Sequence, residues 1–142
     1  MSRENEDLLR RYYDAWNRGD LAALDELVAP DLVNHDPALP GLPPGREGVK
    51  AVLAGFRSAF PYLHYTIEDQ VSGGDKVVTR FTLRGTNRGE FGGMPATGKS
   101  VTVAGITIER IADGKTVEYW RRTDDLGIMQ QLGVFPGLSQ AA

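Results

Sequence analysis

The sequence contains no cysteine and only two histidines. Without cysteine, the chain can form no disulfide, no thiolate nucleophile and no cysteine-ligated zinc or iron–sulfur site. Two histidines do not favour a histidine-based metal centre, so we expect no metal ion. Long apolar runs are absent, and the first seven residues lack the apolar core of a signal peptide. We therefore expect a cytoplasmic protein that makes no membrane contact.

An excess of positive charge is also missing. Lys and Arg number 16 against 19 Asp and Glu, which gives a net charge of −3. Proteins that bind nucleic acid usually carry a basic excess or stripe, so we expect no nucleic-acid partner. Hydrophobic residues make up 41% and charged residues 25% of the 142 residues, as is usual in globular proteins. This length predicts a single domain, residues 1–142, with one core.

Helical periodicity dominates the first 60 residues. Large apolar side chains recur every three or four positions from Leu8 to Trp16, which predicts a helix that Gly19 ends in a left-handed cap. Residues 21–28 predict a short second helix, opened by Asp20 and ended by Pro30. Residues 46–60 predict a third helix. Between them, residues 31–37 are expected to be extended, and a loop rich in proline and glycine follows.

The rest of the chain alternates apolar and polar residues, as strands do. We expect strands near residues 63–67, 76–86, 100–111 and 116–124, with a hairpin turn at Asp113 and Gly114. Residues 126–134 predict a short helical turn or packing segment. Helices followed by a four-stranded antiparallel meander indicate an α+β domain, whose curved sheet packs on the N-terminal helices and encloses a pocket.

Several motifs together resemble one family. They are residues 11–20 (RYYDAWNRGD), 34–37 (NHDP), 45–48 (GREG), 92–99 (GGMPATGK), 118–120 (EYW) and 124–133 (DDLGIMQQLG). The sequence is similar to the SnoaL-like polyketide cyclases, or ester cyclases, of the nuclear-transport-factor-2-like superfamily. The resemblance covers nearly the whole chain and implies a cone-shaped α+β fold. It also implies a hydrophobic small-molecule ligand and a homodimer.

Members of this family close a ring in a polyketide methyl ester by an intramolecular aldol reaction, without a cofactor. The resemblance places their acid–base aspartate at Arg121 and its histidine partner at Thr107, so both groups are replaced. Arginine stays protonated and cannot act as a base near neutral pH. Arg121 could instead stabilise a substrate carboxylate or enolate, pair with Glu109, or form a salt bridge on a solvated face.

A second comparison, with the ketosteroid isomerases of the same superfamily, suggests other catalytic residues. Their base is an aspartate followed by proline, which Asp36 matches, and their oxyanion-binding tyrosine matches Tyr12. His35, beside Asp36, is an alternative base because histidine titrates near neutral pH. The alternatives are structural: Asp36 could cap the backbone, and Tyr12 could be a core residue.

Further candidate residues could bind the substrate. Strand parity places Tyr119 and Arg121 on one face, and Thr107 and Glu109 on the matching face of the neighbouring strand. Trp120 has the opposite parity and is expected outside the pocket or at a dimer face. Asp124 could reach the cavity or cap the following turn. The full set of predicted substrate-binding residues is Trp16, Phe56, Thr107, Glu109, Tyr119 and Asp124.

Three functions remain open from the sequence. The first is a cofactor-independent cyclase or isomerase that acts on a hydrophobic, carbonyl-bearing molecule. The second is a non-catalytic binding protein that kept the cavity and lost the acid–base pair. The third is an epoxide-opening or hydrating enzyme, which would need a carboxylate pair flanking Arg121.

Overall fold

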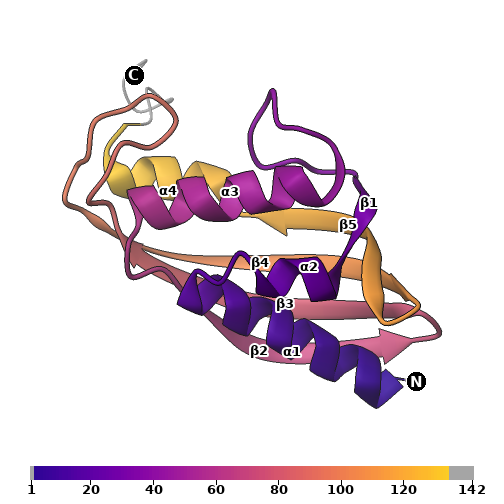
Figure 1. Ribbon diagram of the computed structural model, residues 1–142. Coiled ribbons are helices and arrows are strands. Elements are labelled where there is room, and N and C mark those ends of the chain that lie inside the picture. The colour runs from indigo at the N-terminus through magenta and orange to yellow at the C-terminus, as the bar shows by residue number, and fades with distance from the viewer. Residues whose placement is uncertain (1, 135–142) are drawn as a thin grey trace.

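The structure is a computed structural model that describes residues 2–134; residues 1 and 135–142 of the predicted domain lie outside the described part. Helices and strands follow one another in the predicted order, helices first (Figure 1). The elements are α1 (Ser2–Arg18), α2 (Ala23–Leu27), β1 (Val28–Asn34), α3 (Gly45–Ala59), β2 (His64–Gly73), β3 (Lys76–Thr86), β4 (Ser100–Ala112), β5 (Lys115–Thr123) and α4 (Asp125–Leu132). No helix in the described residues is long and apolar enough to span a membrane.

The sheet has five strands, in the order β1-β5-β4-β3-β2. Strands β2 to β5 form the predicted antiparallel meander. An extended segment was predicted at residues 31–37, but its place in the sheet was not: β1 pairs in parallel with β5, with Val28 opposite Thr116 and Asn34 opposite Tyr119. The expectation that the second helix continues to Pro30 is wrong, because the helix ends at Leu27 and the strand includes Pro30. Proline is tolerated there because β1 lies at the sheet edge.

Burial alternates along β4, which defines an inner and an outer face of the sheet. From Val101 to Ile111, every second side chain is buried, and this set includes Thr107 and Glu109. Gly105 belongs to the same face, and a Cβ atom there would collide with the ring of Phe81 on β3. A residue without a side chain at position 105 therefore lets the Phe81 ring lie against the sheet.

The helices cover the inner face. Helix α1 packs on β2 and β3, α3 packs on β1, and α4 packs on β4 (Figure 1). The predicted apolar stripe of α1 is buried in the core: Leu8, Leu9, Tyr12, Tyr13 and Trp16. Gly19 ends this helix with a φ of 68°, as predicted. Side chains of the helices and of the sheet together form one hydrophobic core.

The predicted turns also form. Asp113 and Gly114 have φ values of 52° and 73°, the two left-handed residues of a type I′ hairpin between β4 and β5. The tail forms a complete helix, α4, which ends at Gly133 with a φ of 75°.

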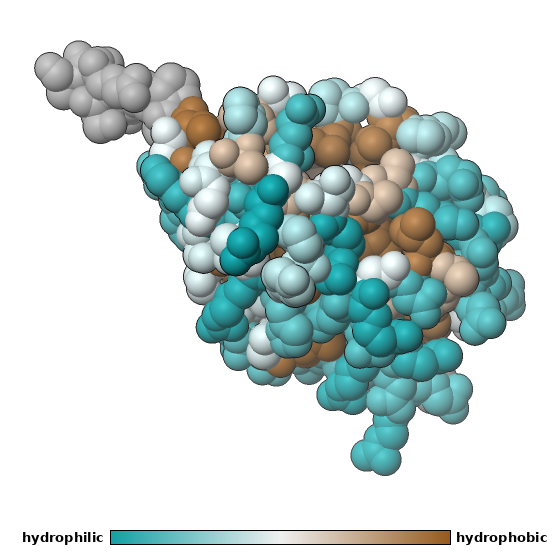
Figure 2. All heavy atoms as spheres, turned by 60° about the vertical axis from the view of Figure 1, so that its left-hand side comes forward, coloured by the Kyte–Doolittle hydropathy of each residue, from teal (hydrophilic) through white to brown (hydrophobic). Residues whose placement is uncertain are grey.

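The surface is largely hydrophilic on the face that Figure 2 shows, and hydrophobic side chains gather there in several patches.

Candidate functional site

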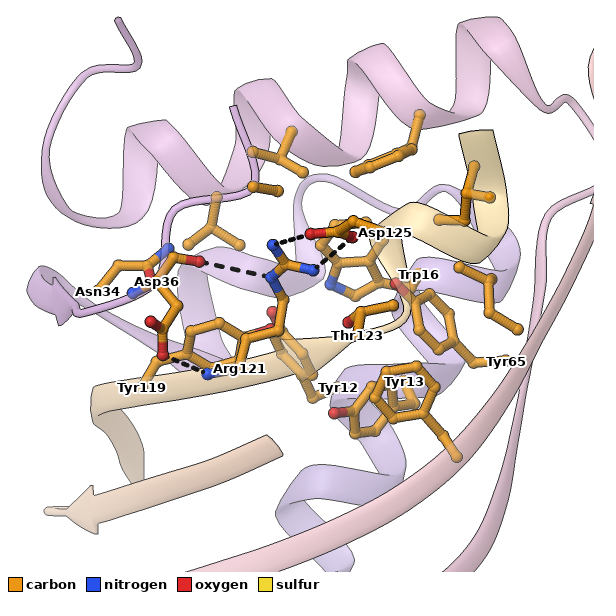
Figure 3. Close-up of a pocket in the computed structure, with 17 residues that line it drawn as sticks. Tyr12, Tyr13, Trp16, Asn34, Asp36, Tyr65, Tyr119, Arg121, Thr123 and Asp125 are labelled. Atoms are coloured by element: carbon orange, nitrogen blue, oxygen red, sulfur yellow. Dashed lines mark hydrogen bonds and ion pairs between the residues drawn. The ribbon is translucent and has the colours of Figure 1, made fainter. Parts of the chain in front are cut away.

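A cavity lies between the inner face of the sheet and the helices (Figure 3). Its walls come from α1, α3 and α4 and from strands β1, β2, β3 and β5. The lining residues include Tyr12, Tyr13, Trp16, Phe56, Tyr65, Phe81, Tyr119, Arg121 and Asp125. Its free volume is about 50 Å³, well below the roughly 300–1,000 Å³ usual for ligand pockets. A ligand with several rings therefore requires the aromatic side chains to move.

Aromatic rings form most of the wall. The ring of Tyr65 lies 5.2 Å from that of Tyr13 and 5.0 Å from that of Phe81, between ring centroids. Trp16 packs against Phe56 from the neighbouring helix, at 6.4 Å. The indole Nε1 of Trp16 is buried near the Tyr12 phenol and makes no hydrogen bond of normal geometry within residues 2–134. An N–H group of this kind is available to a ligand oxygen.

The predicted residues Tyr12, Trp16, Phe56 and Tyr119 all line this cavity. Burial raises the pKa of the Tyr12 phenol, and the nearby carboxyl group of Glu109 raises it further. Burial likewise raises the pKa of Tyr119. Both phenols are therefore neutral hydrogen-bond donors near neutral pH.

Arg121 lies at the polar edge of the cavity, between two aspartates (Figure 3). Its Nη1 and Nη2 atoms donate to the two carboxylate oxygens of Asp125 at 3.2 and 3.3 Å, and its Nε donates to the backbone oxygen of Asp36 at 3.4 Å. The side chain is only 17% exposed. Burial would lower the pKa of Arg121, but the hydrogen bond and charge of Asp125 outweigh burial and raise it. A permanent positive charge therefore borders an apolar space.

The predicted pair between Arg121 and Glu109 does not form. Strand register explains the error: Arg121 is directly opposite Thr107, whereas Glu109 is opposite Tyr119. Asp125, which the sequence analysis missed, is the actual carboxylate partner. The sequence signal for this partner was the pair of aspartates, Asp124 and Asp125, at the end of the last strand. The prediction used Asp124 alone.

Asp36 lines the cavity, and its carboxylate is held on both sides. One oxygen accepts a hydrogen bond from the backbone N–H of Arg121 at 2.8 Å, and the other lies 2.6 Å from the guanidinium of Arg122. The backbone hydrogen bond, with help from Arg122, lowers the pKa of Asp36. The carboxylate is thus ionised near neutral pH and is a weak proton acceptor.

His35 lies on the other side of the chain. Its ring stacks on Trp120 with centroids 4.7 Å apart, and its Nε2 lies 2.7 Å from a carboxylate oxygen of Glu118. The side chain is 39% exposed and does not line the cavity. Asn34 and Asp36 line the cavity, whereas the His35 side chain between them contacts Glu118 and Trp120, so His35 supplies no base to this pocket in the observed geometry. Trp120 lies outside the cavity, as its parity predicted.

Thr107 and Glu109 face inward but stand apart from the lining of the cavity. The hydroxyl group of Thr107 is bonded to the phenol of Tyr13, with 2.6 Å between the oxygens. Thr107 therefore has a protein partner where a free donor to a ligand was expected. Burial raises the pKa of Glu109 to about 8, and the nearby Thr107 hydroxyl offsets only part of that rise. The sequence predicted that Thr107 and Glu109 contact the substrate, but neither residue lines the cavity.

Asp124 caps helix α4: its carboxylate accepts a hydrogen bond from the backbone N–H of Gly127 at 2.8 Å. The capping alternative is correct, and the proposal of Asp124 as a substrate-binding residue is wrong because its carboxylate is directed to the helix terminus. Within residues 2–134, no three acidic or histidine side chains cluster in a way that could hold a metal ion.

The sequence and the fold match known proteins. A family model described as "SnoaL-like polyketide cyclase" matches residues 6–132. The chain therefore belongs to the SnoaL-like polyketide cyclase family, as the motifs predicted. This match covers every described helix and strand except the first residues of α1.

Particular relatives agree with this assignment. The aklanonic acid methyl ester cyclase DauD of Streptomyces sp. (strain C5) is 33% identical over 133 residues, which are 89% of this chain and 80% of the relative. DnrD of Streptomyces peucetius, with the same activity in its name, is 31% identical over 89% of both chains.

Solved structures also match. TsrD from Streptomyces laurentii superposes with a TM-score of 0.87 at 32% identity, covering 95% of this chain and 98% of that one. IdmH from Streptomyces antibioticus gives a TM-score of 0.79 at 39% identity, covering 92% of this chain and 99% of that one. These similarities confirm the predicted α+β fold.

Proposed function

We propose that this protein is a cofactor-independent cyclase that closes a ring in a hydrophobic, polyketide-like molecule. One observation carries the proposal: the aromatic cavity ends at the guanidinium group of Arg121, which Asp36 and Asp125 hold in place. Apolar walls with a few fixed polar groups suit a carbonyl-bearing ring system. Membership in the cyclase family and similarity to DauD and DnrD support the same substrate class.

The reaction that fits is an intramolecular aldol addition. A base removes a proton from the carbon beside one carbonyl group, and the resulting enolate carbon attacks a second carbonyl carbon. A carbon–carbon bond forms, the attacked oxygen becomes an alkoxide, and a proton converts it to a hydroxyl group. Positive charge fixed at the edge of an apolar cavity stabilises the negative oxygen in such a step. We assign this role to Arg121.

The proton acceptor is one of the two carboxylates beside Arg121. The pKa of Asp36 is lowered, and its two oxygens are held by two different donors, the backbone N–H of Arg121 and the guanidinium of Arg122. Within the described part of the chain, both oxygens of Asp125 have one partner, the guanidinium of Arg121. We therefore expect Asp125→Asn to reduce turnover more than Asp36→Asn does.

Aklanonic acid methyl ester is the first substrate to test, because two relatives carry its name. The purified protein is incubated with the ester, and the products are separated by chromatography coupled to mass spectrometry. Cyclisation moves atoms only within the molecule, so the expected product has the same mass and a new retention time. A small panel of other polyketide methyl esters extends the assay.

Two arginine variants test the role of the cavity edge. Arg121→Met is expected to lower kcat/KM by about 100-fold, the usual effect of removing a group that stabilises an oxyanion. Arg84→Met removes an exposed guanidinium from β3 and should leave turnover unchanged. Equal activity of both variants would contradict the assigned role of Arg121.

Non-catalytic binding is the second candidate function, and the state of Asp36 favours it. A carboxylate kept ionised by two donors resembles a structural cap more than a tuned base. Native mass spectrometry with the same panel distinguishes the two functions. Stable complexes without any isomeric product would overturn the cyclase proposal and support a carrier.

A further inference from the structure

One buried carboxyl group takes no part in the site proposed above. The side chain of Glu109 is 0% exposed, and neither of its oxygens makes a hydrogen bond of normal geometry within the described residues. A buried polar group without a partner costs free energy, so its presence calls for an explanation. Packing alone offers none, since an apolar residue of similar size would fill the same space without that cost.

The surroundings of Glu109 keep the group neutral. It faces Tyr12 and Tyr13 from α1 and Tyr119 from β5, while its neighbour across β3 is Val77. None of these side chains carries a charge near neutral pH. Burial raises the pKa of the carboxyl group to about 8, so it carries a proton under ordinary conditions.

A route leads from this group to the cavity. Thr107 lies two residues before Glu109 on the same strand and the same face, close enough for its hydroxyl group to affect the carboxyl group. The Thr107 hydroxyl lies 2.6 Å from the phenolic oxygen of Tyr13, and Tyr13 lines the cavity. Hydroxyl groups both donate and accept hydrogen bonds, so each one can receive a proton and pass on another.

We propose that Glu109, Thr107 and Tyr13 form a buried proton relay that links a protonated carboxyl group to the ligand cavity. The relay rests on the proposed cyclase function for its use in turnover. The alkoxide formed by ring closure takes a proton from the phenol of Tyr13, Tyr13 takes one from Thr107, and Thr107 takes one from Glu109. After the product leaves, the base at the cavity edge gives the proton it took from carbon to water. Glu109 then regains a proton from water in the cavity, through Tyr13 and Thr107 in the reverse direction. The total number of protons is unchanged over the cycle.

Glu109 and Thr107 act through Tyr13 and are therefore positioning residues, whereas Tyr13 contacts the ligand. The proton acceptor and the proton donor of the reaction are therefore different groups in different places. The base at the cavity edge receives a proton while the relay, on the inner face of the sheet, supplies one. Neither carboxylate has to perform both steps at once.

Infrared spectroscopy tests the stored proton without any substrate. A protonated carboxyl group buried away from water gives a distinct carbonyl band, which we expect in the wild-type protein at pH 6. Glu109→Gln should remove this band while the protein stays folded by circular dichroism. In the wild type, the band should fade as the pH rises past about 8. A spectrum of folded wild-type protein without the band at pH 6 would overturn the proposal.

Exchange with deuterated water tests the route. Transfer into D2O shifts the carbonyl band as the carboxyl proton exchanges, and the time course reports proton movement to the cavity. Thr107→Val and Tyr13→Phe each interrupt the relay and should slow the exchange at least tenfold. Thr116→Val, which removes another buried hydroxyl group on β5, serves as the matched control and should leave the rate unchanged.

The outcomes separate the relay from the cyclase proposal. Equal exchange rates in the wild type, Thr107→Val and Tyr13→Phe would overturn the relay even if aklanonic acid methyl ester is cyclised. Slowed exchange in both variants supports the relay even if that ester is not a substrate. Where turnover is measured, both variants should lower kcat with little change in KM, because the relay acts after the substrate is bound.

Discussion

Glu109 makes the free energy of unfolding depend on pH. Burial raises its pKa from 4.5 to about 8 in the folded protein, whereas the unfolded chain keeps the ordinary value. Between these two values, the folded state holds a proton that the unfolded state has lost. Stability is therefore highest below pH 4.5 as far as this group is concerned, and it falls as the pH rises toward about 8, by about 1.4 kcal/mol per pH unit.

The first stability prediction follows from this fall in stability with rising pH. Glu109→Gln removes the titrating group and should flatten the loss of stability between pH 5 and about pH 8, measured by urea unfolding at several pH values. Glu90→Gln, which changes an exposed glutamate in the loop before β4, is the control and should keep the wild-type slope. Parallel curves for the wild type and Glu109→Gln would contradict the assigned protonation.

Single residues were the hardest level to predict. Alternation correctly placed Thr107 and Glu109 on one face of the predicted strand, because side-chain parity is a local property. The partner of Arg121 depends on strand register and on a helix that starts only after β5, so Asp125 could not be deduced from parity. His35 was proposed because it is next to Asp36 and titrates near neutral pH, but proximity in sequence does not show which side chain faces the cavity, and only Asp36 lines it.

The loop between β3 and β4 depends on one buried side chain. The side-chain oxygen of Asn87 accepts hydrogen bonds from the backbone N–H and the hydroxyl group of Thr97, at 2.8 and 3.0 Å. Its amide nitrogen donates to the backbone oxygen of Gly89 at 2.8 Å. These bonds close a loop whose Phe91 packs on Phe56, and Phe56 lines the cavity. By holding this loop, Asn87 helps to keep Phe91 against Phe56 in the cavity wall.

We predict that Asn87→Ala destabilises the protein by about 2 kcal/mol, because it leaves buried backbone groups without partners. Hydrogen exchange should show faster exchange of the Thr97 amide, while amides of β4 keep their protection. Asn5→Ala, on the partly exposed surface of α1, is the matched control and should change stability far less. Unchanged exchange at Thr97 would mean that other contacts hold the loop.

Most helices and strands could be predicted because they depend on local patterns. The α1 stripe, the Asp113–Gly114 turn and the alternation along β4 are all readable within a few residues. Strand β1 was missed as part of the sheet because its pairing with β5 joins segments far apart in the sequence. A proline at its third residue also favoured a helix end over an edge strand.

At the scale of the whole molecule, the outer face of the sheet carries a partly exposed apolar row. Val71, Val78, Ile108 and Trp120 are opposite one another across four strands, and the neighbouring Ile106 is 46% exposed. Exposed apolar surface of this kind is typical of protein interfaces. We keep the prediction of a homodimer and assign its contact to this face.

Light scattering coupled to size-exclusion chromatography tests the dimer. Ile106→Glu places a charge in the apolar row and should shift the wild-type dimer toward monomer. Tyr62→Glu changes an exposed aromatic residue before β2 and should leave the mass unchanged. A monomeric wild-type protein would contradict the prediction directly.

The sequence predicted the architecture of the molecule better than its chemistry. Family motifs spread over nearly the whole chain identified the fold, and the match over residues 6–132 confirms it. The cavity walls were partly predicted, through Tyr12, Trp16, Phe56 and Tyr119. At its polar edge, Arg121 and Asp36 were candidates from the sequence, whereas Asp125 was missed because the three residues meet only when separate elements pack together.

The parallel pairing of β1 with β5 has a consequence for biosynthesis. Asn34 and Asp36 reach the cavity only once β5 is available, and Asp125 follows β5 in the chain. A nascent chain that has left the ribosome as far as Thr86 contains the sequences of α1, α2, α3, β2 and β3. It contains Asp36 but lacks Arg121 and Asp125 of the polar edge. Such distant contacts also form slowly, because long loops must close first. Most of the aromatic wall can therefore assemble during translation, while Tyr119 on β5 and the charged groups Arg121 and Asp125 join it later.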